Sequence, residues 1–277
     1  MKKSELCYAI WSWGGSKEEL ELAAQEISAI GYRKFETTER AMYAYDFNAN
    51  EYKSMLDRYS LTAESFYFFM PEAGKEAALF DVLEREFEFL AKIGVQNATL
   101  QAVFGRPQNG IMDEASEQHN LNVIRKFSNI AKSFGLKTSI HPHVNTYCMY
   151  EDEIDFVMQN LSADEVGLAP DTAHMAATGA DPMKIMEKYA DRITFTHLKD
   201  YKFSEETPLK SWVGSDFHVS KCFYEIGSGA LDFPKIMKIL ESVHYDGPLC
   251  IELDRSRTSN EESAKKSFDY LSKFLEG

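Results

Sequence analysis

The stretch that decides the fold reads LAPDTAHMAATGADP at residues 168–182 and ITFTHLKD at residues 193–200. Each piece begins with an apolar run of strand length, and residues 181–192 place apolar side chains at helical spacing. The pattern predicts a strand–helix–strand unit with parallel strands. Its polar side chains Asp171, His174, His197 and Lys199 follow the carboxyl ends of the strands. Parallel α/β proteins carry their ligand-binding and catalytic groups at that edge.

The same rhythm of helix, glycine and strand recurs along the chain. Gly31, Gly94, Gly135 and Gly247 each follow an amphipathic segment and precede a short β-rich run. Glycine just past a helix adopts the left-handed C-cap conformation at little steric cost. We therefore predict strands at Leu6–Trp13, Tyr32–Thr38, Ser65–Met70, Ala98–Val103, Lys137–His143, Val166–Asp171, Ile193–Asp200 and Pro248–Asp254.

Helical segments fill the intervals between these strands. Ser16, followed by two glutamates, predicts a helix N-terminus, and apolar spacings of three and four predict helices at Glu76–Ile93, Glu117–Phe134, Asp181–Arg192 and Asn260–Phe274. Eight strands alternating with eight helices predict an α/β protein, a single (β/α)8 TIM-barrel domain over residues 1–277. The long segment Tyr201–Gly227, which holds Trp212, Asp216 and His218, is a candidate lid.

Composition argues against several classes of protein. The chain has 277 residues, of which 44% are hydrophobic, and a formal net charge of −14. Because such a surface repels phosphate backbones and acidic lipid, we expect neither nucleic acid nor a membrane as partner. The four cysteines show no CxxC spacing and the N-terminus no signal-peptide pattern, so we expect a cytoplasmic protein with reduced thiols. A homo-oligomer is compatible with all of these features.

Alternation along the strands determines which side chains face the barrel interior. The inward strand-end set is His141, His143, Asp171, His174, His197, Lys199 and Glu252. Two imidazoles and two carboxylates from four strands, His141, Asp171, His197 and Glu252, can surround one divalent ion and leave room for substrate oxygens. The alternative is that each is an ordinary buried, hydrogen-bonded polar group. Their shared position at the strand ends favours the metal site.

Four further residues are predicted substrate contacts, each with a competing structural interpretation. Glu36 follows the second strand and either binds hydroxyls or caps the loop, and Gln101 ends the fourth strand. Trp13, with Trp11, either walls the pocket or belongs to the core. Glu225 precedes a Gly-Ser-Gly turn that lacks the third glycine and the βαβ start of a dinucleotide-binding fingerprint.

The motifs resemble the xylose-isomerase-like TIM barrels, also described as sugar phosphate isomerases/epimerases, over essentially the whole chain. They are IHPH at 140–143, PDTAH at 170–174 followed by GADP, HLKD at 197–200, EIGSGALDF at 225–233 and IELD at 251–254. Within this family the pattern is most similar to the inosose (keto-inositol) dehydratases. The resemblance implies one divalent ion (Mn, Co, Mg or Zn) on Asp171, His197 and Glu252, with substrate hydroxyls on His143 and His174.

One departure from the family pattern bears on the reaction. Many isomerases and epimerases of this family carry a glutamate where this chain has His141, and that glutamate both binds metal and moves a proton. Without it a two-glutamate proton shuttle is missing, so we favour elimination of water from a keto-sugar or keto-cyclitol. The candidate catalytic groups are His143, His174, Lys199 and Glu252.

Other functions remain open at this point. The same site could perform isomerisation or epimerisation, because removal of a proton beside a carbonyl is the shared first step. An endonuclease-IV-like nuclease would need a basic groove and more metal ligands, which the acidic charge argues against. A barrel that binds sugar without turnover is the non-enzymatic alternative. Replacing His141 by alanine should abolish turnover in a metal enzyme and spare affinity in a mere binding protein.

Overall fold

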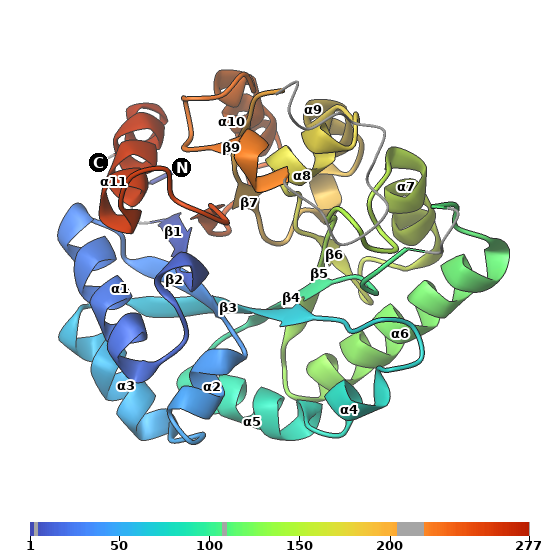
Figure 1. Ribbon diagram of the computed structural model, residues 1–277, viewed down its shortest axis with the longest axis horizontal. Helices are drawn as coiled ribbons and strands as arrows, with labels where there is room; N and C mark the ends of the chain where they lie inside the picture. The colour runs from blue at the N-terminus through green and yellow to red at the C-terminus, as the bar shows by residue number, and fades with distance from the viewer. Residues whose placement is uncertain (3–4, 107–109, 204–218, 277) are drawn as a thin grey trace.

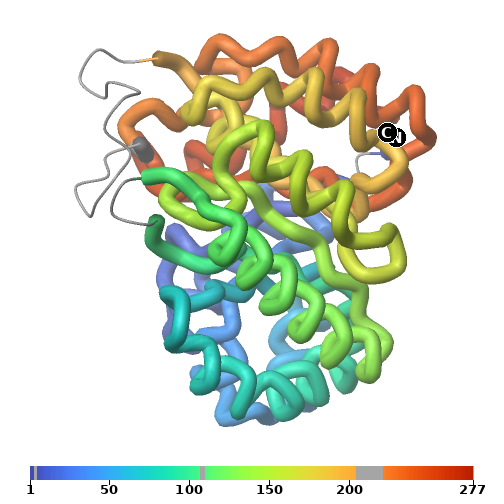
Figure 2. Tube along the Cα trace, turned by 90° about the vertical axis from the view of Figure 1, so that its right-hand side faces the viewer, coloured from blue at the N-terminus to red at the C-terminus, as the bar shows by residue number. Residues whose placement is uncertain are grey.

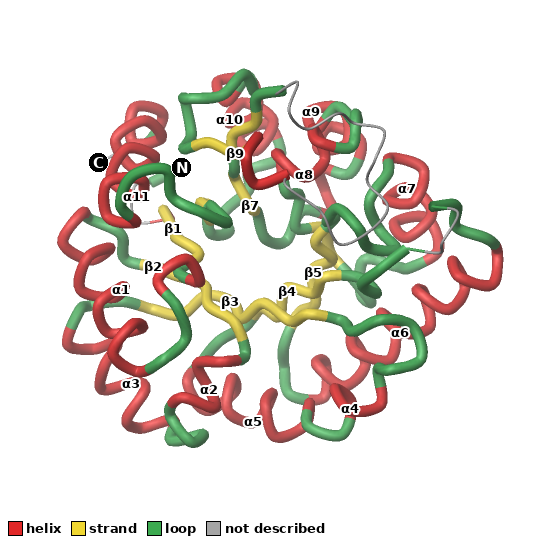
Figure 3. Tube along the Cα trace, viewed as in Figure 1, coloured by secondary structure: helices red, strands yellow, loops and turns green. Residues whose placement is uncertain are grey.

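The computed structural model describes residues 1–2, 5–106, 110–203 and 219–276 of the chain. Trp212, Asp216 and His218 of the candidate lid lie outside the described residues. Strands form a ring with helices around its outside (Figures 1 and 3). The two chain ends lie side by side (Figure 2), where Lys2 and Glu276 form a parallel bridge. Within the described residues, none of the helices is both long and apolar enough to cross a membrane.

The main sheet confirms the predicted TIM barrel. Among the described residues it has eight strands, paired in parallel in the order β6-β5-β4-β3-β2-β1-β10-β7. They are β1 (Leu6–Ala9), β2 (Lys34–Thr38), β3 (Thr62–Phe69), β4 (Asn97–Gln101), β5 (Lys137–His141), β6 (Gly167–Leu168), β7 (His197–Leu198) and β10 (Leu249–Ile251). The first and last members of this order, β6 and β7, meet through the bridges Leu168↔Ile193 and Asp171↔His197.

Several strands are shorter than predicted, for identifiable reasons. The first strand ends at Ala9 because a 3-10 turn occupies Trp11–Trp13. The predicted strand Ile193–Asp200 is divided: Ile193 makes an isolated bridge to Leu168, and His197–Leu198 forms the barrel strand. Asp200–Tyr201 (β8) instead pairs in antiparallel fashion with Phe223–Tyr224 (β9).

Helices alternate with the strands and cover the outer face of the ring. They are α1 (Lys17–Ile30), α2 (Arg40–Ala44), α3 (Ala49–Arg58), α4 (Ala77–Phe80), α5 (Leu83–Ile93), α6 (Glu114–Ser133), α7 (Glu151–Asn160), α8 (Thr172–Ala177), α9 (Pro182–Lys188), α10 (Phe233–Ser242) and α11 (Asn260–Leu271). The predicted helix Glu76–Ile93 is therefore two helices. Ser16 caps α1 as predicted, accepting a hydrogen bond from the Glu19 amide.

The predicted glycine caps are confirmed at three of the four positions. Gly31, Gly94 and Gly135 follow helices with φ of 127°, 86° and 77°. After α10, however, His244 takes the left-handed conformation, with φ of 53°, in place of Gly247. The strand alternation is also borne out: Leu249 and Ile251 join the main core, whereas Cys250 packs with Cys7, Ala9, Ala169 and Phe195.

Aromatic packing makes the wall behind the sheet rigid. Phe66 on β3 lies 6.4 Å from Phe89 on α5, and Phe68 lies 5.3 Å from Phe127 on α6, in edge-to-face geometry. Such pairs contribute about 1 kcal/mol each beyond the burial of their area. This core fixes the strands, and the strand ends in turn fix the polar groups at the mouth of the barrel.

Candidate functional site

A group of buried polar side chains occupies the carboxyl ends of the barrel strands. His141 ends β5, Asp171 precedes α8, His197 begins β7 and Glu252 follows β10. One ligand atom from each lies within 4.8 Å of the others, and all four residues are buried. The structure thus brings together the set that the sequence suggested, which we call the mixed quartet because it has two nitrogen and two oxygen donors.

A β-bulge places the glutamate that orients His197. The register between β2 and β3 shifts between Phe35 and Glu36, and bulges re-aim side chains in this way. The fully buried Glu36 lies with Oε2 2.5 Å from Nε2 of His197. With that nitrogen donating its proton to Glu36, Nδ1 of His197 presents a lone pair to the quartet. Glu36 therefore lies behind His197, on the far side of its ring from the quartet.

Asp171 has one oxygen for the fold and one for the site. Oδ1 accepts hydrogen bonds from the amides of Ala173 and His174, so Asp171 is the N-cap of α8. Oδ2, by contrast, is buried and makes no hydrogen bond among the described residues. Capping thus holds the carboxylate in one orientation, with its second oxygen directed into the quartet.

Ligand-type atoms in the quartet lack the partners that buried polar atoms normally have. Oε2 of Glu252, Nε2 of His141 and Oδ2 of Asp171 are all buried, and the described part of the chain provides no hydrogen bond to them. Oε2 of Glu252 lies only 3.1 Å from Nδ1 of His197, so two lone-pair donors face each other. A divalent cation would satisfy all of these atoms, and mixed imidazole–carboxylate sets suit Zn²⁺, Mn²⁺ or Co²⁺.

Lys199 is the cation that the structure places beside the quartet. Its buried ammonium lies 2.5 Å from Glu252, 2.9 Å from Asp254 and 3.3 Å from Asp171. Burial opposes this charge, but the surrounding carboxylates raise the pKa of Lys199 above its ordinary value. That direction is the opposite of what a catalytic base needs at neutral pH. Lys199 therefore acts here as a fixed positive charge.

The pKa values of Glu252 and Asp254, two carboxylates beside Lys199, are shifted in opposite directions. Burial raises the pKa of Glu252 well above its usual range, although Lys199 opposes the change. Asp254 is also penalised by burial, yet the attraction of Lys199 lowers its pKa overall. Asp254 was not among the predicted site residues. It lies two positions after Glu252, so strand alternation directs both side chains to the barrel interior, and this spacing could have identified it.

His143 and His174 lie next to the quartet, as the sequence suggested. Their ring centroids are 3.8 Å apart, and His174 lies 5.8 Å from His141. Nδ1 of the partly exposed His143 lies 2.7 Å from the carbonyl oxygen of Val144, to which it donates. Burial lowers the pKa values of both His143 and His174, so both rings are neutral at pH 7 and offer lone pairs.

The predicted substrate contacts are only partly gathered at the site. Gln101 is buried at the end of β4 and accepts a hydrogen bond from Tyr67, whose ring lies 5.1 Å from that of His141. Trp13 instead packs in the core and donates to Glu26. Trp11 is the tryptophan beside the quartet, 5.8 Å from the His197 ring.

Glu225 and the Gly-Ser-Gly turn belong to a structural device. Glu225 accepts from Ser263 of α11. The amides of Gly227 and Gly229 donate to the carboxylate of Asp200 at 2.9 and 2.8 Å. A Cβ at Gly229 would lie 2.3 Å from Asp200 Oδ1, so only glycine fits there. The amides of this turn therefore bind the carboxylate of Asp200, a residue of the same chain, and not a phosphate group of a ligand.

Comparison with known proteins agrees with the fold. Residues 24–274 match the family model of the xylose isomerase-like TIM barrel. An inosose dehydratase of Clostridium beijerinckii is 27% identical over 258 residues, covering 87% of this chain and 84% of the relative. An inosose dehydratase of Lactiplantibacillus plantarum is 30% identical over 156 residues, or 55% of this chain and 52% of the relative.

A solved structure extends the agreement in fold to the whole chain. The IOLI protein, solved with a bound zinc atom, superposes with a TM-score of 0.77 at 17% identity and covers 100% of both chains. An L-ribulose 3-epimerase has the same TM-score at 14% identity, over 98% of this chain and 94% of its own. With the family model matched over most of its length, the chain belongs to the xylose isomerase-like TIM barrels.

Proposed function

We propose that this protein is a divalent-metal-dependent enzyme that removes a proton beside the carbonyl of a keto-sugar or keto-cyclitol and then expels water. The observation that carries the proposal is the mixed quartet, in which one buried atom each of His141, Asp171 and Glu252 lacks a hydrogen bond within the described residues. The similarity to an inosose dehydratase over 87% of this chain supports the choice of substrate class and reaction. Small-molecule carbohydrate is thus the proposed partner.

The residues of the quartet would hold the ion through Asp171, His197, Glu252 and His141. A divalent cation there supplies Lewis-acid stabilisation to the negative charge that develops on the carbonyl oxygen after proton removal. Glu36 fixes the orientation of His197, and the N-cap hydrogen bonds fix Asp171, so the ligand atoms need little reorganisation. Lys199 reduces the net negative charge of the carboxylates at the same place.

A histidine is the proposed base. His143 donates through Nδ1 to Val144, which leaves the Nε2 lone pair on a partly exposed ring to accept a proton from substrate. His174 is the neighbouring group that can bind the departing hydroxyl, and His143, once protonated, can pass the proton taken from carbon to that hydroxyl so that it leaves as water. Both rings are neutral before the reaction, as general-base catalysis requires. The buried ammonium of Lys199 has no place in this proton transfer.

Proton NMR in D2O tests the reaction. The protein, loaded with Mn²⁺ or Co²⁺, would be incubated with keto-inositols, 3-keto-glucosides and common ketoses, beside an EDTA-treated sample. We expect a metal-dependent olefinic or deoxy-diketone product. Deuterium incorporation beside the carbonyl, or a new epimer, without loss of water would replace dehydration by isomerisation or epimerisation. The structural similarity to an L-ribulose 3-epimerase concerns the fold, which is compatible with that second function.

A further inference from the structure

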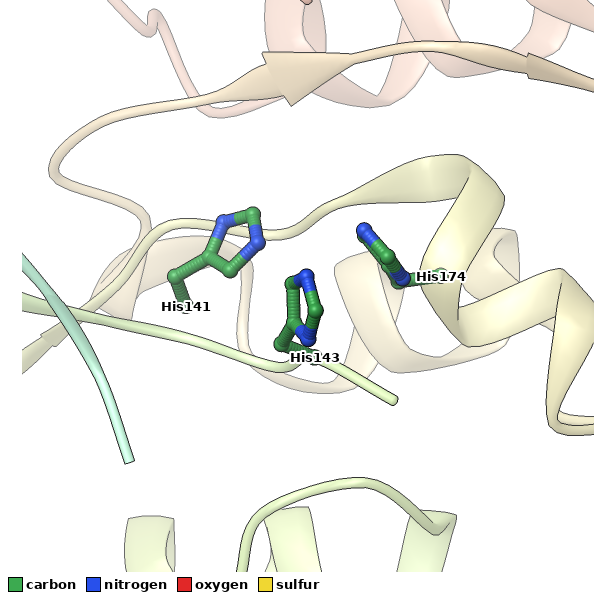
Figure 4. A group of neighbouring side chains, drawn as sticks. All are labelled: His141, His143 and His174. Atoms are coloured by element: carbon green, nitrogen blue, oxygen red, sulfur yellow. The ribbon is translucent and has the colours of Figure 1, made fainter. Parts of the chain in front are cut away.

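Three histidine rings converge beside the mixed quartet. His141 and His143 come from the end of β5, and His174 comes from the short helix α8 (Figure 4). Their ring centroids are separated by 5.6 Å, 5.8 Å and 3.8 Å, and one nitrogen from each lies within 4.8 Å of the others. We call these residues the histidine trio.

The nitrogen atoms of the trio are presented as electron-pair donors. Nε2 of His141 and both ring nitrogens of His174 are buried and make no hydrogen bond to any described residue. The Nδ1 proton of His143 is engaged by the Val144 carbonyl at 2.7 Å, which leaves Nε2 without a proton. A hydrogen bond from one ring nitrogen to a backbone carbonyl is the arrangement that fixes histidines as metal ligands.

We propose that the histidine trio is a second metal position, made of nitrogen donors only, that competes with the mixed quartet for His141. Imidazole donors favour Cu²⁺, Ni²⁺ and Zn²⁺ over Mg²⁺ and Mn²⁺, which prefer carboxylate oxygen. The two positions therefore select different ions from the same cavity. The metal of choice for the trio is a borderline transition-metal ion such as Cu²⁺ or Zn²⁺.

His141 can serve only one of the two positions at a time as a neutral ligand. Its Nδ1 lies 2.6 Å from Nδ1 of His197, whereas its unpartnered Nε2 lies 3.9 Å from Oδ2 of Asp171 in the quartet and also faces the rings of His143 and His174 (Figure 4), so the same nitrogen would serve either position. An ion in the trio withdraws His141 from the quartet and occupies the lone pairs of His143 and His174. If the proposed function holds, excess Cu²⁺ or Zn²⁺ thus inhibits the Mn²⁺-loaded enzyme.

Electron paramagnetic resonance of bound Cu²⁺ tests the position without substrate, so its outcome does not depend on the proposed reaction. The quartet offers two nitrogen ligands and the trio offers three. We expect the superhyperfine pattern of the unaltered, metal-depleted protein with one equivalent of Cu²⁺ to show three nitrogens. His174→Gln should reduce the pattern to two nitrogens and weaken Cu²⁺ binding at least tenfold. Asp171→Asn should leave three nitrogens and change the affinity less than twofold.

A matched control removes a histidine outside the cluster. His119→Ala on α6 eliminates an imidazole that is bonded to Glu76, and it should alter neither the spectrum nor the affinity. A two-nitrogen spectrum in the unaltered protein that disappears with Asp171→Asn would place copper in the quartet and overturn the proposal. Loss of the copper signal in His119→Ala would likewise overturn it, because the ion would then be bound at the surface.

Discussion

Two of the places where this barrel buries carboxylates compensate the charge in different ways. At the mouth, Asp171, Glu252 and Asp254 surround the ammonium of Lys199. Between α2 and α5, which are neighbours on the outer ring (Figure 1), Glu86 is only 1% exposed. It accepts a hydrogen bond from Tyr43, and no ion pair to it is found in the described part of the chain.

The two places differ in whether a nearby cation compensates the buried carboxylates, and this difference distinguishes the candidate site from the structural core. Burial raises the pKa of Glu86 to about 7, with the Tyr43 hydrogen bond opposing that rise and nearby Glu39 adding to it. Glu86 can therefore keep its proton and become neutral. At the mouth the buried Lys199 supplies a positive charge instead: it lowers the pKa of Asp254 and opposes the rise that burial causes in the pKa of Glu252. Charged groups held in this way are what a metal site needs. The following four predictions test this contrast.

The largest effect should come from Asp171→Asn. The amide still caps α8 through its oxygen, so the fold should persist, but a charged ligand atom of the quartet is lost. We expect the metal-dependent turnover to fall by about 10³-fold or more. Steady-state kinetics with Mn²⁺ measures it. Turnover within tenfold of the unaltered enzyme would show that the quartet does not carry the chemistry.

Lys199→Met should destabilise the protein by about 3–5 kcal/mol, because it leaves the buried carboxylates of Asp171 and Glu252 and the partly exposed carboxylate of Asp254 around a missing cation. Urea unfolding measures this loss, and added Mn²⁺ should restore part of it. The matched control is Lys235→Met, which breaks the exposed pair with Glu187 and should cost under about 1 kcal/mol. Equal losses of unfolding free energy in the two variants would show that Lys199 at the mouth of the barrel contributes no more to stability than an exposed lysine.

Glu36→Gln should weaken metal binding by about 10–100-fold with little change in stability, because it disturbs the orientation of His197 while keeping the side-chain volume. Isothermal titration of Mn²⁺ into the metal-depleted protein measures the affinity. Glu64→Gln is a suitable control, since Glu64 lies on the adjacent β3 and pairs with Lys34 away from the quartet. Unchanged affinity in Glu36→Gln would assign Glu36 to substrate instead.

Glu86→Gln should have the smallest effect, and only at higher pH. The pKa of Glu86 rises from 4.5 to about 7 on folding, so the folded state holds its proton more tightly. The stability of the unaltered protein therefore falls as pH rises from about 4.5 to 7 and is flat above, by at most about 3 kcal/mol.

The glutamine variant should lack that slope and be the more stable of the two at pH 8. Urea unfolding at pH 5 and pH 8 compares them. Glu84→Gln, on the exposed side of the same helix, should follow the unaltered protein. A parallel pH dependence in the Glu86→Gln variant would mean that Glu86 is ionised in the folded state.

The barrel and the membership of the quartet could be predicted because both follow from local periodicity. Glycine after several of the helices marks the start of the next strand, and alternation along a strand assigns Glu252 and Leu253 to opposite faces. The contact between Glu36 and His197 could not be predicted. It accompanies a shift in the register between β2 and β3, and the pairing of two strands cannot be read from the sequence of either strand alone. The 3-10 turn after Ala9 likewise breaks the strand pattern under which Trp11 and Trp13 were treated alike, and it separates their positions.

The short bridges between β6 and β7 have a consequence for how this barrel opens. Asp171↔His197 is one of those bridges, so two residues of the quartet lie on opposite sides of the weakest lateral joint in the sheet. Amide protons there should exchange with solvent earlier than those of the long β3–β4 ladder. An ion bound by both Asp171 and His197 would cross-link β6 and β7 and stabilise their pairing. In the metal-free protein, amide exchange across this joint should therefore become fast below the temperature at which the helices melt.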